Sequence, residues 1–473
     1  MIKQIGFPIF SSENKKLADK STILAEPIPS IDLLERACYQ LVKMLEKEIS
    51  LGVPIHIVCG NGNNGADGLC IARILNFKGY LVEVSVLQNQ SQYTIEHNIQ
   101  FRLLELTTVK ITRVKNIEDF FIRKDQIIID AIIGSGLNKA LDGEIKDIVL
   151  KINELNPIVF SIDNPTGIGT WDHFEGHYIQ ANKTFCLGTV SPALLSRNYQ
   201  QDIVCVDIGL NETQGPTPLG WFLTKGKSTE FIESTLPKHK KHDHKGNRGH
   251  ALVIGGNTGM HGAICMTAKM ASKVGAGNVT ICSHMNTLPY ITTMPEIQFK
   301  ESALDGKAAD YLEIEGYESI AIGPGLGVSA KTTAFLSFML GKRIIAPMVF
   351  DADALNIIAK NKNLIQRVPE NSIFTPHPKE LERLFGKFDN ENSKWKFLSE
   401  FARKQKIHIL AKDTYSILFC ADGEIYVNGT GNERLAKGGS GDKLTGLIAG
   451  YLAQGLKAKH AAICGMFELI EFA

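Results

Sequence analysis

The segment Lys437–Asp442 places three glycines, a serine and one carboxylate directly before an apolar helical pattern. Apolar side chains recur every three or four positions from Leu444 to Leu452, which predicts a helix that begins near Asp442. Glycines at a helix N-terminus let several backbone N–H groups converge on a phosphate, and the helix dipole adds to the attraction. A carboxylate beside such an anion site is suited to removing a proton. The structural alternative is an acidic cap on a glycine-rich turn.

A second glycine-rich stretch, Gly60–Gly68, follows the β-branched run Ile55–Cys59 and opens a helical pattern from Leu69 to Lys78. Its backbone amides are therefore expected to face whatever lies at the carboxyl end of the strand, as in a phosphate-binding loop. Polar side chains in a merely structural turn need hydrogen-bond partners, and this turn holds three asparagines and an aspartate. The stretch therefore predicts a ligand-binding loop.

Two aspartates close apolar strand-like runs in the same half of the chain. Asp130 follows Ile127–Ile129, and Asp163 follows Ile158–Ile162. In a parallel sheet the carboxyl ends of all strands lie on one edge, so we expect both aspartates at one crevice. Asp163 is then a candidate proton shuttle, and a loop cap is the alternative for each aspartate.

Hard oxygen atoms are expected at the same crevice. The amide of Asn64 and the carboxylate of Asp130 suit an alkali or alkaline-earth cation. Thr166 lies three positions after Asp163 and is expected at the same sheet edge.

These side chains need a scaffold that brings the ends of several strands together. From Pro54 to Gly209, short β-branched runs alternate with helical stretches, which is typical of a doubly wound parallel sheet. Turn-forming residues over Asn211–Gly220 break the pattern, and a second α/β series starts at Ala251. The chain of 473 residues also exceeds the size of a single core. We therefore expect an α/β protein with two three-layer αβα domains, residues 1–219 and 220–473.

The composition shows no sign of a polyanionic partner. Lysine and arginine total 51 residues against 50 aspartates and glutamates, which argues against nucleic acid or an anionic membrane as the main partner. The nine cysteines are scattered, as expected of free thiols in a reducing compartment, so we expect a cytoplasmic protein. We also expect a homo-oligomer. No signal peptide or run of about 18 apolar residues is found. We interpret Lys238–Lys245 as a solvated basic connector, with a metal or phosphate clasp as the alternative.

The second half carries a series of polar motifs, each at or just after a strand-like run. In chain order they are Gly255–Asn257, Gly323–Gly327, Asp351–Asp353, Thr375–Glu380, Lys412–Ser416 and Gly438–Asp442. Singly they are weak signals, because His377 between prolines fits a rigid loop and Asp351 fits a helix cap. Asp422-Gly423 predicts a β-hairpin that brings the last motif back to the sheet edge.

Three segments of the first half resemble the signature segments of the NAD(P)H-hydrate epimerase family: Gly60–Gly68, Asp130–Gly136 and Ser161–Gly167. Leu33–Ala37 is similar to the family's early helix, and the resemblance covers nearly all of residues 20–210. It implies a Rossmann-like domain that interconverts the two C6 epimers of hydrated NADH and NADPH, which are called NADHX and NADPHX.

The same resemblance implies roles for individual residues. It places the substrate against Asn63, Asn64, Gly65, Ala66, Asp67, Gly134, Ser135, Gly136 and Asp163. It implies a catalytic Asp163 near the epimerised carbon and a potassium ion held by Asn64, Asp130 and Thr166. The family's lysine is absent from the segment Leu187–Ser191, so a weakened epimerase is expected.

The motif order of the second half, over about residues 237–455, resembles the ADP/ATP-dependent NAD(P)H-hydrate dehydratase family, which has a ribokinase-like fold. It implies that ADP or ATP, with Mg²⁺, phosphorylates the C6 hydroxyl of (6S)-NADHX or (6S)-NADPHX before elimination restores the reduced dinucleotide. Asp442 would accept the hydroxyl proton, and the amides of Gly439–Gly441 would hold the transferring phosphoryl oxygens. The implied substrate contacts are Ala263, Gly325, His377 and Asp442. The implied nucleotide contacts are Lys412, Asp413, Thr414, Tyr415, Ser416 and Gly441.

Three positions depart from the second family's pattern: Asp413 replaces a usual glycine, Glu433–Leu435 replaces a glycine-containing segment, and Lys443 replaces an apolar residue. Because the charge of Asp413 would lie near the nucleotide phosphates, weaker nucleotide binding is expected. The two resemblances together predict a bifunctional repair enzyme, both a lyase and an isomerase. The alternatives are a small-molecule kinase of the ribokinase-like fold and an N-terminal module that binds a nucleotide or a protein without catalysis.

Overall fold

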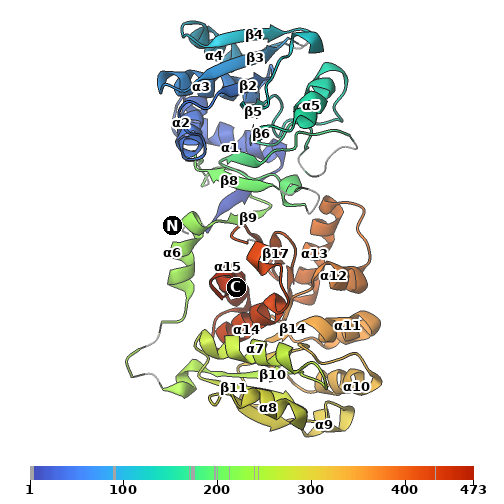
Figure 1. Ribbon diagram of the computed structural model, residues 1–473. Coiled ribbons are helices and arrows are strands. Elements are labelled where there is room, and N and C mark those ends of the chain that lie inside the picture. The colour runs from blue at the N-terminus through green and yellow to red at the C-terminus, as the bar shows by residue number, and fades with distance from the viewer. Residues whose placement is uncertain are drawn as a thin grey trace. The chain divides into compact units, whose positions relative to one another are not determined.

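The computed structural model describes residues 5–88, 92–169, 171, 176–196, 199, 201–211, 213–238, 240–242, 244–431 and 433–472. The chain divides into two compact units: Phe7–Gly220, the N-terminal unit, and Trp221–Ala473 together with Met1–Gly6, the C-terminal unit. Figure 1 labels the elements of both units. His239 and Asp243 of the predicted basic connector lie outside the described residues.

The N-terminal unit is built on a sheet in the order β4-β3-β2-β5-β6-β7-β8, in which every neighbouring pair is parallel. The chain winds outward from β2 in one direction and from β5 in the other, so the loops after these two strands diverge and leave a crevice. The strands of the unit are β1 (Phe7–Ile9), β2 (Ile55–Cys59), β3 (Val82–Leu87), β4 (Lys110–Val114), β5 (Ile127–Ala131), β6 (Ile158–Ile162), β7 (Lys183–Leu187) and β8 (Asp202–Val206).

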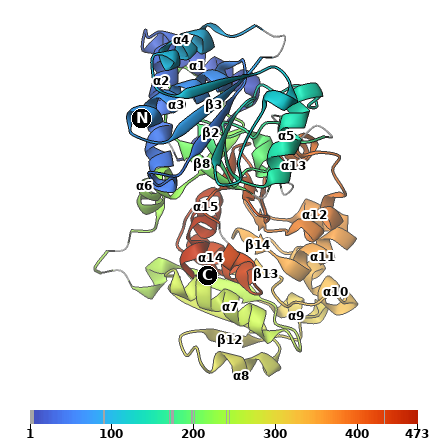
Figure 2. The ribbon, with the colours of Figure 1, turned by 45° about the horizontal axis from the view of Figure 1, so that its top comes forward.

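Helices cover both faces of this sheet. Ile57 and Ile129 pack into a core with α2, α3 and α4, whereas Val58 and Ile128 pack into a second core with α5. Figure 2 shows the strands between these two sets of helices. This alternation is what a parallel sheet buried on both faces requires. The helices of the unit are α1 (Ser12–Ala25), α2 (Ser30–Glu48), α3 (Asn63–Phe77), α4 (Ile95–Glu105) and α5 (Gly143–Leu155), with 3₁₀ turns η1 (Ile117–Asp119) and η2 (Pro192–Leu195).

The sheet of the C-terminal unit runs in the order β9-β18-β17-β16-β15-β14-β13-β10-β11-β12. Its strands are parallel from β12 to β16, and β17 and β18 form an antiparallel hairpin. The strands are β9 (Gly220–Leu223), β10 (His250–Ile254), β11 (Asn278–Ser283), β12 (Gln298–Glu301), β13 (Ser319–Ile322), β14 (Met348–Phe350), β15 (Ile373–Phe374), β16 (His408–Ala411), β17 (Ser416–Phe419) and β18 (Ile425–Asn428).

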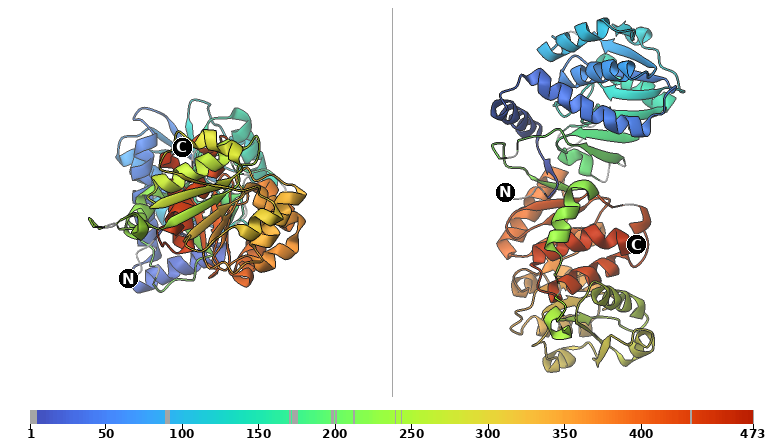
Figure 3. Two further views of the ribbon diagram at one scale, coloured as in Figure 1. Left: turned by 90° about the horizontal axis from the view of Figure 1, so that it is seen from below. Right: turned by 90° about the vertical axis from the view of Figure 1, so that its left-hand side faces the viewer.

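This second sheet also lies between two helical layers, and the view from below in Figure 3 shows helices on both of its sides. Val253 and Ala321 face a core shared with α7, α14 and α15, whereas Leu252 and Ile320 face a core shared with α10 and α11. The helices are α6 (Lys225–Thr235), α7 (His261–Lys273), α8 (Leu288–Ile291), α9 (Gly306–Tyr311), α10 (Ala330–Met339), α11 (Ala352–Lys360), α12 (Pro378–Phe385), α13 (Glu391–Gln405), α14 (Ser440–Ala453) and α15 (Ala458–Glu468). The 3₁₀ turns are η3 (Lys245–Arg248), η4 (Met285–Thr287), η5 (Lys362–Arg367), η6 (Glu433–Leu435) and η7 (Leu469–Phe472).

The predicted α/β class with parallel sheets is confirmed, and so is the hairpin around Asp422-Gly423. The strands β4 and β7 were not predicted. The expected start of the third helix near Leu69 was wrong, because α3 already begins at Asn63 with Gly62 as its cap. Its early glycines allow close backbone packing and do not mark a loop. Among the described residues, no helix is long and apolar enough to span a membrane.

Candidate active sites

Glycines let the loops after β2 and β5 approach each other in the N-terminal unit. A Cβ atom on Gly60 would lie 2.1 Å from the carbonyl oxygen of Ile132, and one on Gly65 would lie 1.9 Å from that of Gly60. Neither distance is possible for a real side chain, so both positions require glycine. The first turn of α3 is thereby held against the two loops at the carboxyl edge of the sheet.

A cavity of about 550 Å³ opens at this edge, within the N-terminal unit. Apolar side chains of the cavity wall come from α1 and α2, and also from segments at the carboxyl edge of the sheet: Ile23, Leu33, Leu34, Ala37, Ile132, Ile133, Leu187 and Ile208. The predicted site residues that line it come from α3 and from the loops after β5 and β6: Asn63, Asn64, Asp67, Gly134, Ser135, Gly136 and Asp163. An apolar wall with converging polar groups is the usual form of a small-molecule site.

Asp163 is held in one orientation by two elements. Its Oδ1 accepts a hydrogen bond from the ammonium of Lys15 on α1, and its Oδ2 accepts one from the backbone N–H of Ser135 at 2.8 Å. Its backbone has a φ of 69°, in the left-handed region that few non-glycine residues adopt. Burial alone would raise the pKa of Asp163, but the charge and hydrogen bond of Lys15 hold it below its usual range.

The neighbouring carboxyl groups behave differently. Burial, opposed by Lys15, raises the pKa of Asp19 to about 6, and burial and the charge of Asp163 raise the pKa of Asp67 to about 8. At neutral pH the cavity therefore holds two carboxyl groups that are mainly ionised, Asp163 and Asp19, whereas Asp67 is largely protonated. A pair of carboxyl groups separated in this way can act as base and acid.

Asp130 lies behind the cavity and is fully buried. Its carboxylate accepts hydrogen bonds from the hydroxyl of Ser161 at 2.8 Å, the hydroxyl of Thr166 at 2.6 Å, and the backbone N–H groups of Thr166 at 2.9 Å and Ile132 at 3.2 Å. These four donors fill the acceptor positions of a carboxylate. The predicted potassium ion therefore does not fit Asp130 and Thr166 as they are arranged, and no step below uses it.

In the C-terminal unit, small residues bring α14 against α7. A Cβ on Gly446 would lie 2.2 Å from the carbonyl oxygen of Thr267, and one on Gly439 would lie 2.6 Å from the sulfur of Met266. The hydroxyl of Thr267 donates to the carbonyl oxygen of Asp442 at 3.1 Å. This packing places the first turn of α14 beside α7.

The first turn of α14 has the features of an anion site. The first N–H groups of any helix lack partners within the helix, and Gly439 before them has a φ of 89°. The hydroxyl of Ser440 is buried without a hydrogen-bond partner among the described residues. The backbone N–H of Ser440 makes a long hydrogen bond of 3.4 Å to the carbonyl oxygen of Lys437. A buried hydroxyl without a partner at a helix N-terminus indicates a site that an acceptor ligand completes.

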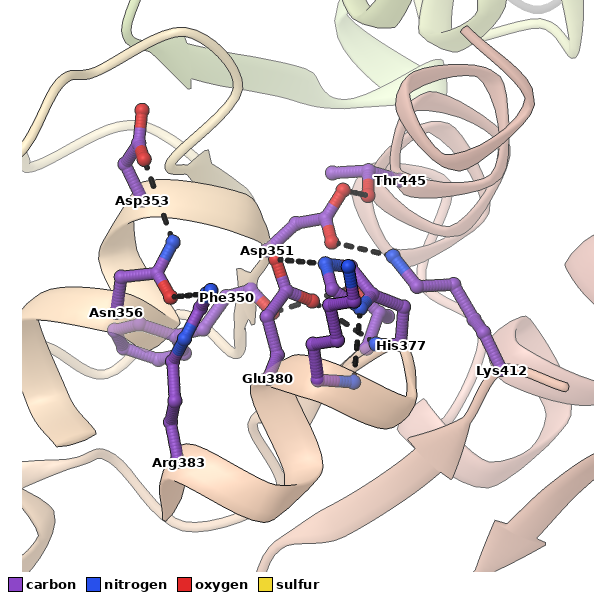
Figure 4. A network of polar contacts seen from close by, with 11 residues as sticks. Phe350, Asp351, Asp353, Asn356, His377, Glu380, Arg383, Lys412 and Thr445 are labelled. Carbon is purple, nitrogen blue, oxygen red and sulfur yellow. Dashed lines mark hydrogen bonds and ion pairs between the residues drawn. The ribbon is translucent and has the colours of Figure 1, made fainter. Parts of the chain in front are cut away.

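A buried ion pair lies directly behind this turn (Figure 4). The ammonium of Lys412 donates to Oδ1 of Asp351 at 2.7 Å, and the hydroxyl of Thr445 donates to Oδ2 at 2.8 Å. A Cβ on Gly441 would lie 3.3 Å from the ammonium of Lys412. Both oxygens of Asp351 are therefore occupied, whereas the carboxylate of Asp442 accepts no hydrogen bond from the described residues.

The surroundings of Asp442 tune its proton affinity. Burial and the nearby charge of Asp351 raise its pKa to about 6, and the charge of Lys412 opposes them. The group is therefore mostly ionised at neutral pH and still basic enough to take a proton, as a general base must be.

His377 caps α12 at the same edge of the sheet. Its Nδ1 accepts the backbone N–H of Lys379 at 3.2 Å, and its own backbone N–H donates to Glu380 at 2.9 Å. Burial, with the charges of Lys412 and Arg383, lowers the pKa of His377. The imidazole is therefore neutral near pH 7, with about half of its side chain open to solvent.

The comparisons with known proteins cover both units. Residues 251–471 match the family model described as NAD(P)H-hydrate dehydratase, and residues 30–193 match the one described as YjeF-related protein N-terminus. The bifunctional NAD(P)H-hydrate repair enzyme of Coxiella burnetii is 30% identical over 470 residues, which cover 96% of this chain and 92% of that protein. The enzyme of the same name from Moorella thermoacetica is 31% identical over 468 residues, covering 93% and 87%.

This chain belongs to the family of bifunctional NAD(P)H-hydrate repair enzymes. Among solved structures, the ADP/ATP-dependent NAD(P)H-hydrate dehydratase from Bacillus subtilis, co-crystallised with ATP and Mg²⁺, is 31% identical. That match covers 51% of this chain and 85% of that one, with a TM-score of 0.44.

Most residues expected from the family lie at one of the two sheet edges. In the N-terminal unit, Gly65 and Ala66 are buried in α3 and do not line the cavity, because they pack against the sheet. In the C-terminal unit, Ala263 lies in the first turn of α7, and Gly325 follows β13 with a φ of 60°. Gly441 lies in the first turn of α14.

The segment Lys412–Ser416, predicted to bind the nucleotide, joins β16 to β17. The carboxylate of Asp413 accepts the backbone N–H of Thr414 at 2.9 Å, so it caps its own loop. Tyr415 packs edge-on against Phe222, and Ser416 is the first residue of β17. The ammonium of Lys443 donates to the carbonyl oxygen of Phe472 at 2.5 Å. That contact ties α14 to η7, which explains a lysine where the family has an apolar residue.

Sequence reasoning missed Lys15 and Asp19, which line the cavity from α1, and Thr445, which holds Asp351. The lysine expected in Leu187–Ser191 is absent there, but Lys15 brings an ammonium into the same cavity, which Leu187 also lines. Each missed contact joins residues far apart in the chain, so no local pattern marks it. The one available signal was the polar face that Lys15 and Asp19 share, one turn apart on a helix.

Proposed function

We propose that this chain repairs hydrated nicotinamide dinucleotides at two sites. The C-terminal unit dehydrates (6S)-NADHX and (6S)-NADPHX at the expense of ADP or ATP, and the N-terminal unit interconverts the two C6 epimers. Relatives of this name match nearly the whole chain, and the sheet edge of each unit has an ionised carboxylate, Asp163 in one and Asp442 in the other. We assign the activities to the domains 1–219 and 220–473.

In the dehydratase step Asp442 takes the proton of the C6 hydroxyl as its oxygen attacks the terminal phosphorus of the nucleotide. The N–H groups of Gly439–Gly441 and the hydroxyl of Ser440 hold the phosphoryl oxygens. Loss of a C5 proton then forms the C5–C6 double bond, phosphate departs with the bonding electrons of the C6–oxygen bond, and NADH or NADPH is restored. His377, Gly325 and Ala263 lie where the dinucleotide would rest.

Magnesium would accompany the nucleotide and supply charge neutralisation at its phosphates. The ion would be held mainly by the phosphates of the nucleotide and by water, because Asp351 is already paired and Asp442 is the proposed base. Lys412–Ser416 and Gly441 would contact the nucleotide, and the ammonium of Lys412 is held by Asp351.

In the epimerase step Asp163 takes the proton of the C6 hydroxyl as the C6–N1 bond breaks, so that C6 becomes an aldehyde and the ring nitrogen takes a proton from Asp67. Attack of the nitrogen on the other face of the aldehyde reverses both proton transfers and gives the other epimer. The cavity wall of Ile23, Leu33 and Leu34 would shelter the ring from water. Asn63, Asn64 and Gly134–Gly136 provide polar contacts around it. Potassium at Asn64, Asp130 and Thr166 stays a prediction that the filled acceptor positions of Asp130 do not favour.

The observation that carries the proposal is the carboxylate of Asp442, which lies in the first turn of α14 and accepts no hydrogen bond from the described residues. The test supplies purified protein with purified (6S)-NADHX and either ATP or ADP, and follows the return of dihydronicotinamide absorbance. We expect one nucleotide at least to restore absorbance with release of stoichiometric phosphate. A stable phosphorylated dinucleotide would instead favour the alternative of a ribokinase-like kinase, which full-length similarity to repair enzymes does not support.

Two predictions concern the protein as a whole. A cytoplasmic location is supported by the nine cysteines, all of which are free thiols, as expected in a reducing compartment. That the protein is a homo-oligomer remains a prediction, which light scattering on the purified protein can test. The same absorbance assay, run with each combination of nucleotide and hydrated dinucleotide, measures the preference for ADP or ATP and for NADHX or NADPHX.

A further inference from the structure

The ammonium of Lys15 and three aspartates form a cluster in the N-terminal cavity, which Lys16 and Glu96 also line. Lys15 and Asp19 come from α1, Asp67 from α3, and Asp163 from the loop after β6, and all four line the cavity. Cys186 of β7 also lies within reach of the charge of Asp163. The charge of Lys15 lowers the proton affinity of each of the three carboxyl groups.

Two hydrogen bonds join the first turn of α1 to the loops after β5 and β6. Besides the contact of Lys15 with Asp163, the hydroxyl of Ser12 donates to the carbonyl oxygen of Ser135. Ser135 is the residue whose N–H holds the other oxygen of Asp163. Lys15 therefore both orients the Asp163 carboxylate and supplies the positive charge next to it, with only 15% of its side chain exposed.

A buried ion pair is weak evidence for a stabilising role, because a well-packed apolar pair is often as stable. Here the pair lies in the wall of a ligand cavity, its carboxylate is the proposed base, and three carboxyl groups converge on one ammonium. A structural contact would need none of this convergence.

We propose that Lys15 is a positioning residue of the epimerase site, which keeps the carboxylate of Asp163 oriented and ionised among its acidic neighbours. This inference rests on the proposed epimerase function. Without the ammonium, three facing carboxyl groups lose the cation that they share, and Asp163 is expected to hold a proton to higher pH. Its capacity as a base at neutral pH then falls.

The test compares full-length wild type with Lys15→Met, Lys15→Gln and Lys15→Arg. Epimerisation of (6R)-NADHX is followed by chromatography of the two epimers from about pH 5 to about pH 9, and dehydration of (6S)-NADHX is measured in parallel. Lys20→Met is the matched control, because Lys20 lies on the same helix, is exposed and does not line the cavity. Thermal unfolding of each variant shows whether it folds.

We expect the two neutral variants to lose about tenfold or more in kcat/KM for epimerisation near pH 6, since a general base contributes on the order of 10² to 10⁴. Their loss should shrink as the pH rises, because Asp163 becomes ionised, so the acid limb of the profile moves to higher pH. Lys15→Arg should keep the wild-type limb, and dehydration should be unchanged throughout.

A wild-type rate and pH profile in folded Lys15→Met would overturn this inference while leaving the epimerase itself established. An equal loss at all pH values, or failure of both neutral variants to fold while Lys15→Arg folds, would reduce the pair to a structural contact. Absence of epimerisation in the wild type would instead overturn the proposed function of the N-terminal unit.

Discussion

The pH dependence of dehydration follows from the groups around Asp442. Burial and Asp351 raise its pKa to about 6, and Lys412 lowers it. The base must be ionised to accept the hydroxyl proton, so kcat/KM is expected to rise through about pH 6 and to level off above it. With a pKa of about 6 the ionised fraction at pH 5 is about one tenth, so kcat/KM there should be about a tenth of its plateau.

Two substitutions should move this acid limb in opposite directions. Lys412→Met removes the charge that lowers the pKa of Asp442, so the limb should move to higher pH. Asp351→Asn removes a charge that raises it, so the limb should move to lower pH. Lys412 and Asp351 form one ion pair at 2.7 Å, and either substitution breaks it. If the effect were a general loss of packing, both substitutions would therefore shift the acid limb in the same direction.

The assay is the initial rate of absorbance return at limiting (6S)-NADHX and saturating nucleotide, from about pH 5 to about pH 8. Lys406→Met serves as the charge control, because Lys406 is exposed and pairs with Glu370 at 2.6 Å away from the motifs of the site. A wild-type profile that is flat between about pH 5 and about pH 7 would refute the proposed role of Asp442. Acid limbs of Lys412→Met and Asp351→Asn that move in the same direction would refute the electrostatic explanation of the pKa of Asp442.

Three further predictions concern packing and the cation. Gly446→Ala forces a Cβ to within 2.2 Å of the carbonyl oxygen of Thr267, which should lower the free energy of unfolding by about 1 to 3 kcal/mol. The melting temperature should fall and dehydration should slow. An unchanged melting curve would contradict the α7–α14 contact. Lys443→Met removes the hydrogen bond to Phe472 and should cost about 1 kcal/mol in the unfolding free energy with an unchanged KM for nucleotide. Replacement of potassium by sodium should leave epimerisation unchanged, and a clear loss would show that Asp130 exchanges a hydrogen bond for the ion.

The sheet and the edge residues were predictable because they depend on local patterns. β-branched runs such as Ile55–Cys59 and Ile127–Ile129 report parallel strands buried on both faces, and a polar residue that closes such a run must lie at the carboxyl edge. The same logic predicts the place of Asp163, whereas the place of Asp442 follows from the helical pattern after it and from the hairpin at Asp422-Gly423. Their chemical setting was not predictable in this way.

What the sequence did not reveal depends on approach between distant segments. Lys15 reaches Asp163 across 148 positions, and Thr445 reaches Asp351 across 94. The buried ammonium of Lys15 is therefore indistinguishable in the sequence from an exposed helical lysine. The early start of α3 was missed for a related reason. Gly65 is needed for its close contact with Gly60, but in the sequence a glycine indicates only a flexible turn.

The central claim is that each unit uses its own carboxylate, Asp442 for dehydration and Asp163 for epimerisation. The direct measurement supplies an equal mixture of (6S)- and (6R)-NADHX with nucleotide to wild type, Asp442→Asn and Asp163→Asn, and follows both epimers and NADH. Wild type should convert the whole mixture, Asp163→Asn should stop once the 6S epimer is consumed, and Asp442→Asn should form no NADH while still interconverting the epimers. Near wild-type formation of NADH by Asp442→Asn, or complete conversion at the wild-type rate by Asp163→Asn, would contradict the account.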